Sequence, residues 1–265
     1  MDINQWDDIW KEIQNDTVER YTKDHILEHW KKGIPENASL RRGWPSKSHT
    51  PHIKHLGYRK NSKAGKETKG EKGLEIKLLG ERGKIKIHYI EKANESLRLQ
   101  VCFHNMGLGT SRGPSQKIID CFGVVNVGNK NYATAIEVKI DNEGPWYAVI
   151  ENLIQVQMLK SNHENLQKYF GNSPLSFGTL SDAWGIVLAP KNYFISKNKE
   201  KSFKRAIDLI EHICDEVKLT LVACDEEPTG VETAFAETNV HKDAYWRLSY
   251  FGGSWPSKTE TLKLS

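Results

Sequence analysis

The chain has 265 residues, with 38 Lys or Arg against 34 Asp or Glu, so its formal net charge is +4. This length suits one domain with a sizeable hydrophobic core, and no apolar run reaches membrane-spanning length. The four cysteines show no paired spacing, which argues against a disulfide scaffold. Residues 1–10 are acidic and amphipathic, unlike a secretory signal, so we expect a reduced, cytoplasmic protein.

Apolar spacing, turn residues and helix-stop residues predict the regular elements along the chain. In chain order we expect helices over Ile3–Gln14 and Thr17–Lys32, a hairpin over Leu74–Leu79 and Lys84–Tyr89, a strand over Leu97–Phe103, a second hairpin over Ile118–Val125 and Tyr132–Ile140, a helix over Trp146–Tyr169, a strand over Trp184–Pro190, a helix over Ser202–Val217 and a strand over Leu219–Cys224. The tail over residues 231–265 has only weak periodicity.

A strongly basic segment separates the first two helices from the first hairpin. Residues 41–72 hold ten Lys or Arg and two acids, whereas residues 1–40 hold five bases and nine acids. Such a density of cations is attracted to phosphate because binding releases counterions. The alternative is a solvated charge run without a partner. Our candidates for nucleic-acid contacts here are Arg41, Arg42, Lys47, Lys54, Arg59 and Lys60.

The second hairpin is the most informative feature of the chain. Its strands flank Gly128-Asn129, which suits a two-residue primed turn because both central positions require positive φ. A turn centred there places Asp120 opposite Glu137, with Cβ atoms about 5 Å apart. Lys139 follows Glu137 by two residues and therefore projects from the same face of the strand.

Two carboxylates and an amine on one face suit metal-dependent hydrolysis of phosphodiester bonds. Mg²⁺ prefers carboxylate oxygens, waters and phosphate oxygens, and it lowers the pKa of bound water. We expect Asp120 and Glu137 to hold Mg²⁺, with the carbonyl of Val138 as a third ligand and Mn²⁺ as a substitute ion. Lys139 would orient or deprotonate the attacking water, or stabilise developing charge.

The alternative interpretation of this trio is an exposed ion pair, which would stabilise the hairpin only slightly. The Glu-x-Lys pattern is weak alone, because Glu75-Ile76-Lys77 and Glu216-Val217-Lys218 repeat it. Neither copy has an aspartate on a facing strand at hairpin distance. Two directly opposed acids also repel one another, so a hairpin without a functional reason tends to avoid them.

Asp120, the hairpin and Glu137-Val138-Lys139 together resemble the motif of the PD-(D/E)XK nuclease superfamily. The resemblance extends more loosely over residues 97–225, although Ile119 stands where the motif often has proline. It implies a restriction-endonuclease-like α/β (α+β) core, with a mixed central sheet flanked by helices. We expect one domain over 1–265, with a helical and basic-loop extension over 1–72, a catalytic core over 73–225 and a C-terminal extension over 226–265.

The resemblance also implies supporting residues. A glutamine on the helix after Lys139 often stands beside such sites, and we select Gln155, one turn after Glu151. A glutamate on the first helix often helps to hold metal, for which Glu19 and Glu28 are equal candidates. Arg112 and Lys117, on either side of Pro114, could contact the scissile strand.

The function expected from this resemblance is a Mg²⁺-dependent endonuclease of restriction type, acting on DNA. Cutting both strands usually needs two active sites, which favours a homodimer. Three alternatives stay open: a repair or phage-defence nuclease acting on branched or single-stranded DNA or on RNA, a nucleic-acid-binding module of the same fold that does not cleave, and an interaction protein in which the trio is only an ion network.

Overall fold

The computed structural model describes residues 21–32, 70–79, 85–107, 118–140, 143–171, 178–224 and 247–256. In these ranges, seven strands form one sheet that closes into a barrel, with strand order β1-β2-β3-β4-β5-β6-β7. The strands are β1 Lys86–Lys92, β2 Glu95–Gly107, β3 Ile118–Val127, β4 Lys130–Val138, β5 Leu180–Pro190, β6 Lys218–Cys224 and β7 Leu248–Gly253. The helices are α2 Lys23–Lys32, α3 Gly70–Leu78, α4 Pro145–Ser161, α5 His163–Gly171, α6 Lys191–Ile195, the 3₁₀-helix η4 Lys197–Lys199 and α7 Glu200–Ile213.

The sheet is mixed. From β1 to β4 each strand pairs antiparallel with the next, whereas β4, β5 and β6 pair parallel in that order and are joined through helices. Strand β7 returns antiparallel to β6 and meets β1 through two parallel pairs, Ile90 with Leu248 and Glu91 with Ser249. This short contact closes the barrel.

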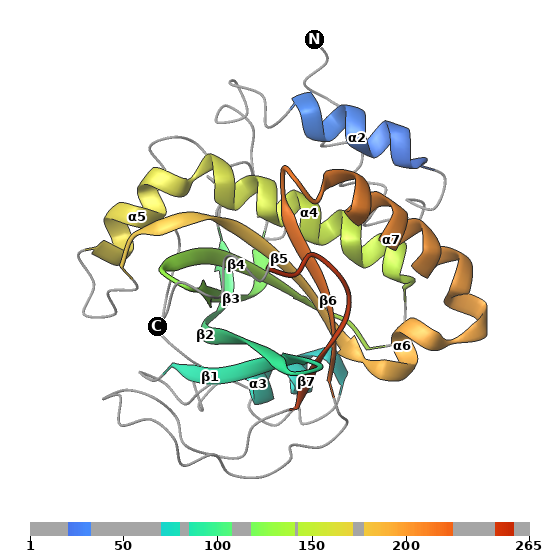
Figure 1. Ribbon diagram of the computed structural model, residues 1–265, viewed down its shortest axis with the longest axis horizontal. Coiled ribbons are helices and arrows are strands. Elements are labelled where there is room, and N and C mark those ends of the chain that lie inside the picture. The colour runs from blue at the N-terminus through green and yellow to red at the C-terminus, as the bar shows by residue number, and fades with distance from the viewer. Residues whose placement is uncertain are drawn as a thin grey trace.

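Two buried clusters lie on the two faces of the sheet. One cluster joins residues of all seven strands with Leu74 and Leu78 of α3, so it fills the barrel interior. The other lies between the sheet and helices α2 and α4 to α7. Helix α4 packs on β4 and β5, and α7 lies beside it (Figure 1). Side chains of β4 alternate between the two clusters. Ile136 and Val138 belong to the inner cluster, and Ala133 and Ala135 belong to the outer one.

The predicted fold class, an open mixed sheet flanked by helices, is wrong. The sheet curls into a closed barrel because residues 248–253, in the tail that lacked clear periodicity, form β7 and bring the β6 edge round to β1. A bulge between Val101 and Phe103 interrupts the pairing of β2 with β3, and bulges increase local strand twist.

Most of the predicted elements that fall in the described ranges are confirmed, although the helix expected over Ser202–Val217 ends at Ile213 and two other elements differ. Leu74–Leu79 is not the first strand of a hairpin but part of α3, and the partner of β1 is β2. The helix expected over Trp146–Tyr169 breaks at Asn162 into α4 and α5. The helix expected over Ile3–Gln14 lies outside the described residues. None of the helices in the described ranges combines the length and apolar character that crossing a bilayer requires.

Candidate functional site

The β3–β4 hairpin has the predicted register. Its turn is at Gly128-Asn129, and Gly128 has a φ of 54°, a conformation that glycine adopts without strain. Cys121 pairs with Ile136, so the next residues along the register are Asp120 and Glu137. The N–H of Val138 donates to Asp120 Oδ2 at 3.2 Å. The two acids are therefore brought together on the sheet face that α4 covers.

Lys139 lies among three carboxylates. Its Nζ is 2.8 Å from Glu137 Oε1, 2.9 Å from Glu151 Oε2 and 3.4 Å from Glu143 Oε2. The side chains of Lys139 and Glu137 are only 9% and 3% exposed, so these pairs are largely removed from water. This arrangement differs from an exposed surface ion pair, because each buried charge depends on its partners.

Gln155 stands beside Glu137, as the sequence predicts. Its Nε2 donates to Glu137 Oε2 at 2.6 Å. Asn152, one turn earlier on α4, donates through Nδ2 to Gln155 Oε1 at 3.2 Å and to the carbonyl of Ala135 at 3.1 Å. The chain Asn152–Gln155–Glu137 thus ties the α4 helix to β4 and fixes which end of the Gln155 amide faces the carboxylate.

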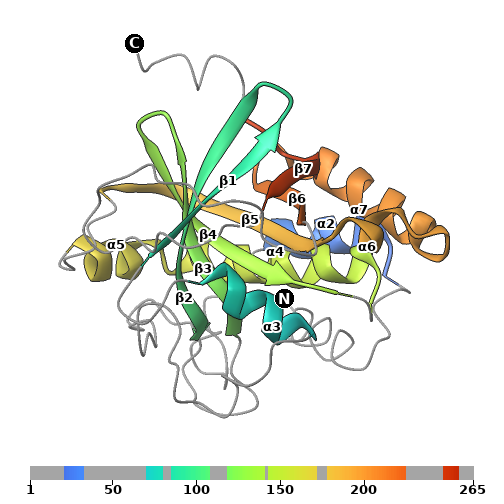
Figure 2. The same cartoon turned by 90° about the horizontal axis from the view of Figure 1, so that it is seen from below.

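Helix α3 adds acids that the sequence reasoning missed. It lies next to β4 (Figure 2). Glu75 is 5% exposed and pairs with Lys72 at 2.8 Å, and Glu71 Oε1 accepts from the N–H of Ile140 at 3.4 Å. Glu71 and Glu75 are four residues apart, which places both acids on one face of a helix. This spacing was the sequence feature that could have indicated their place in the site.

We call Asp120, Glu137, Glu151 and Glu75 the acid cluster, and within it the pKa values of Asp120 and Glu151 are raised. Burial raises the pKa of Asp120 well above its ordinary range, and the charges of Glu137, Glu75 and Glu151 raise it further. Burial and then Glu137 raise the pKa of Glu151 in the same direction. Burial alone would lower the pKa of Lys139, but Glu137 and Glu151 outweigh it and hold that pKa above its ordinary range. Lys139 is therefore an ammonium at neutral pH.

The remaining predicted site residues divide between the site and other parts of the chain. The backbone of Val138, whose carbonyl is the predicted third ligand, lies at the site because its N–H donates to Asp120, and its side chain is buried in the barrel interior. Glu28 is exposed on α2, which packs against α7 (Figure 1), so the helix glutamate near Asp120 is Glu75. The other residues lie outside the described ranges: Glu19, Arg41, Arg42, Lys47, Lys54, Arg59, Lys60, Arg112 and Lys117.

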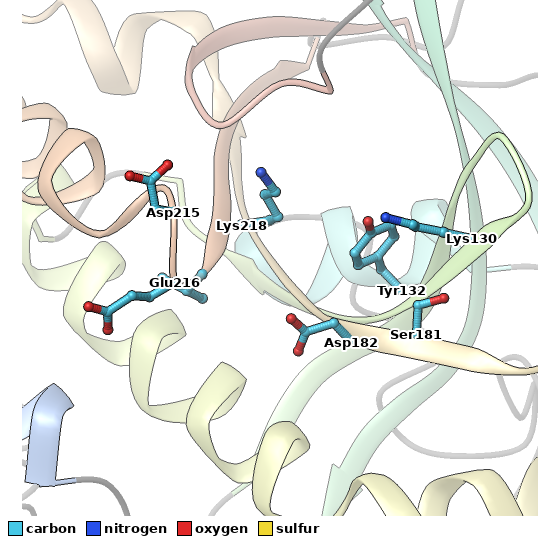
Figure 3. Close-up of a pocket in the computed structure, with 8 residues that line it drawn as sticks. Lys130, Tyr132, Ser181, Asp182, Asp215, Glu216 and Lys218 are labelled. Atoms are coloured by element: carbon cyan, nitrogen blue, oxygen red, sulfur yellow. The ribbon is translucent and has the colours of Figure 1, made fainter. Parts of the chain in front are cut away.

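One cavity of the structure is separate from the acid cluster. It is a cavity of about 340 Å³ lined by residues at the amino ends of β4, β5 and β6, including Lys130, Asp182 and Lys218 (Figure 3). Lys139 follows the opposite end of β4, roughly 30 Å away at the rise of an extended strand. Asp182 already pairs with Lys160 at 3.5 Å. This cavity therefore takes no part in the site around Glu137.

Within the described ranges, no three Asp, Glu, His or Cys side chains are grouped closely enough to hold a metal ion as they stand. Comparison with known proteins found no similarity: no family model, curated protein or solved structure matches this chain. The chemistry of the acid cluster is therefore the basis for a functional proposal.

Proposed function

We propose that this chain is a Mg²⁺-dependent endonuclease that hydrolyses phosphodiester bonds of DNA. The observation that carries the proposal is the meeting of Asp120, Glu137 and Lys139 at the end of β4, with Glu75 and Glu151 around them. Lys139 pairs with Glu137 and Glu151, and the charges of Glu137, Glu75 and Glu151 act on the buried Asp120, so the cluster has a surplus of carboxyl groups over ammonium groups. A divalent cation would neutralise that surplus.

The donor set fits a hard cation. Carboxylate oxygens are the ligands that Mg²⁺ and Mn²⁺ prefer, and Asp120 and Glu137 would hold the ion. When bound, the metal would supply Lewis-acid polarisation of the phosphate and of a water molecule. Gln155 keeps the Glu137 carboxylate oriented through its hydrogen bond at 2.6 Å.

The protonation state of Lys139 limits the roles that its side chain can have in catalysis. Because Glu137 and Glu151 hold its pKa above the ordinary range, the side chain is a poor general base at neutral pH. As an ammonium it would orient the attacking water through its protons and stabilise the negative charge that develops on phosphate oxygens. Such fixed charges in a water-poor site contribute more than the same charges in water.

Cleavage assays test the proposal directly. Purified protein is incubated with supercoiled plasmid, linear duplex, single-stranded DNA and RNA, with Mg²⁺ and then with excess EDTA. We expect cutting of plasmid DNA that requires Mg²⁺ and stops in EDTA. Since two sites are needed to cut both strands, we also propose a homodimer, which would convert plasmid to the linear form. No metal-dependent cutting of any substrate would contradict the proposal.

The closed ion network around Lys139 favours a second candidate function. Its ammonium already satisfies Glu137, Glu151 and Glu143, which is the arrangement expected if the cluster only holds α4 on the hairpin. The chain would then be an interaction protein in which the trio is only an ion network, or a nucleic-acid-binding module that does not cleave. Neither binding nor cutting would favour the interaction protein, and tight, salt-sensitive binding without cutting under any metal condition would favour the module.

The acid cluster should make stability depend on pH in a metal-sensitive way. The folded-state pKa values of Asp120 and Glu151 are raised, so the folded protein binds these protons more tightly than the unfolded chain does. Their stabilisation is complete below the ordinary carboxyl pKa of about 4 and is lost as the pH rises through the raised values. Without metal, the free energy of unfolding should therefore decrease above about pH 4.

Saturating Mg²⁺ should reduce that decrease, because the bound ion favours the charged carboxylates. Urea unfolding at constant ionic strength, between pH 4 and pH 8, measures both curves. Asp120→Asn is the control variant, since it removes one of the two titrating groups and should flatten the metal-free curve. Parallel curves with and without Mg²⁺ would mean that the ion does not bind at these carboxylates.

A further inference from the structure

A basic surface follows strand β5. Residues 191–205 hold six Lys or Arg and a single acid, Glu200. They form α6, η4 and the first turns of α7. Four of the lysines are exposed and Lys199 is half-buried. We call Lys191, Lys197, Lys199, Lys201 and Lys204 the 191–204 surface.

Three of the five lysines on this surface have no carboxylate partner among the residues that the structure describes. The one acid, Glu200, pairs with Lys204 at 2.6 Å. Within the described part of the chain, no ion pair joins Lys191, Lys197 or Lys201 to a carboxylate. The opposite face of this segment is buried in the outer cluster through Tyr193 and Phe194, so the lysines are held on a packed support rather than on a free loop.

The 191–204 surface lies next to the acid cluster. Helix α6 begins directly after β5, and the carbonyl of Leu188 on β5 accepts from the N–H of Lys139 at 3.0 Å. Tyr193 joins the two regions. Lys199 Nζ lies 4.3 Å from the centre of its ring, and its buried hydroxyl has no hydrogen-bond partner among the described residues. Burial raises the pKa of this hydroxyl, and the charge of Lys139 opposes the increase.

We propose that the 191–204 surface binds the phosphodiester backbone of a nucleic acid and holds it against the acid cluster. This inference rests on the proposed function, because it assigns to that site the surface that brings its substrate close. A cluster of carboxylates repels a polyanion until a cation is bound, so an adjacent face of fixed positive charge is needed to retain the strand. Lysines on a rigid support provide that attraction without reading sequence.

A nucleic acid fits this surface better than an anionic membrane does. Ile195, 59% exposed, is the exposed large hydrophobic side chain among the described residues. Helix α6 has only five residues, and its Tyr193 and Phe194 are turned into the core. An interfacial helix needs an extended apolar face, which this segment lacks. A single apolar side chain among lysines can instead contact a sugar or a base.

Nucleic-acid binding measured without cleavage tests the 191–204 surface separately from the proposed catalytic site. Fluorescence anisotropy in EDTA compares duplex DNA, single-stranded DNA and RNA of about 20 nucleotides, across a range of salt concentrations. The test variant is Lys191→Gln/Lys197→Gln/Lys201→Gln. The matched control is Lys31→Gln/Lys130→Gln/Lys168→Gln, which removes the same charge from exposed positions on α2, at the β3–β4 turn and on α5.

We expect the test variant to bind at least tenfold more weakly than wild type and the control less than about threefold more weakly. The dependence of log K on log salt should become less steep by about 2 to 3 for the test variant, at roughly 0.9 for each phosphate that the variant no longer neutralises. Equal weakening in both variants, an unchanged salt slope, or binding of phosphatidylserine vesicles in preference to every nucleic acid would overturn the inference. Circular dichroism confirms folding, and Lys197→Glu alone is a second test on the exposed η4 turn.

Failure of this inference and failure of the proposed function give different results. If the protein cuts DNA in a metal-dependent way and the test variant binds as tightly as wild type, the proposed nuclease activity stands and the proposed role of the 191–204 surface is wrong. If binding depends on these lysines but no metal supports cutting, the role of the surface stands and the proposed nuclease activity is wrong.

Discussion

Lys139→Met is expected to reduce Mg²⁺-dependent cleavage by roughly 100- to 1000-fold, the usual cost of removing one charge-stabilising group from an active site. Methionine keeps the aliphatic length of lysine and removes the ammonium that lies 2.8 Å from Glu137 and 2.9 Å from Glu151. The loss should appear in kcat, because the ammonium is proposed to act on the attacking water and on charge that develops during the reaction.

The same variant should lose stability in the absence of metal. Removing one partner of a buried ion pair leaves the other uncompensated, at a cost of about 3 to 5 kcal/mol. Mg²⁺ should raise the Tm of Lys139→Met more than that of wild type, because the ion supplies the positive charge that the variant lacks. This second measurement separates a role in the site from a purely structural ion network, in which added metal would have no special effect.

Lys160→Met is the matched control for Lys139→Met. Lys160 lies on α4 and, like Lys139, pairs with an acid, Asp182 at 3.5 Å, but it is 32% exposed and lies toward the opposite end of the parallel strands. It should cleave at the wild-type rate and lose little stability. If Lys139→Met folds and cleaves as wild type does, Lys139 has no part in the chemistry.

Gly185→Ala is expected to destabilise the protein by about 2 to 3 kcal/mol, as overpacking of a core does, and to lower cleavage. Gly185 lies on β5 between Ala135 of β4 and Leu219 of β6, under helix α4. An added Cβ would overlap Asn152 Oδ1 and would come within 2.8 Å of Val156 Cγ2. Either α4 must move away from the sheet or Asn152 must change its rotamer.

Gly185→Ala is expected to lower activity because it disturbs the hydrogen-bond chain Asn152–Gln155–Glu137. Asn152 donates to Gln155, which donates to Glu137 at 2.6 Å, so displacement of Asn152 releases the orientation of the carboxylate. Urea unfolding and steady-state cleavage measure the two effects. Ser181→Ala, at an exposed position of the same strand, should change stability by less than about 0.5 kcal/mol. A stable and fully active Gly185→Ala would mean that α4 is not held at this distance.

The sequence predicted those residues of the site that are close together in the chain or lie on two strands paired in one register. Asp120, Glu137 and Lys139 belong to a two-strand hairpin whose turn glycine sets the pairing, so local rules suffice to bring them together. Gln155 was expected from the family resemblance, and its position one helical turn after Glu151 selected it. Glu75 was assigned to a strand, because Leu74–Leu79 is short and apolar, and short apolar runs do not distinguish a strand from a helix.

By itself, the sequence determined the β3–β4 hairpin, the helices after β4 and β5, and the acid pair with its lysine, since each depends on turn residues and on side-chain periodicity over a few positions. Only the tertiary structure decided that the sheet closes, that Leu74 and Leu78 enter the barrel on a helix, and that Glu75 and Glu151 surround the site. The physical reason is that these features depend on pairing and burial between segments far apart in the chain. Strand β7, for example, meets β1 more than 150 residues away, and no local pattern specifies which edge a strand will join.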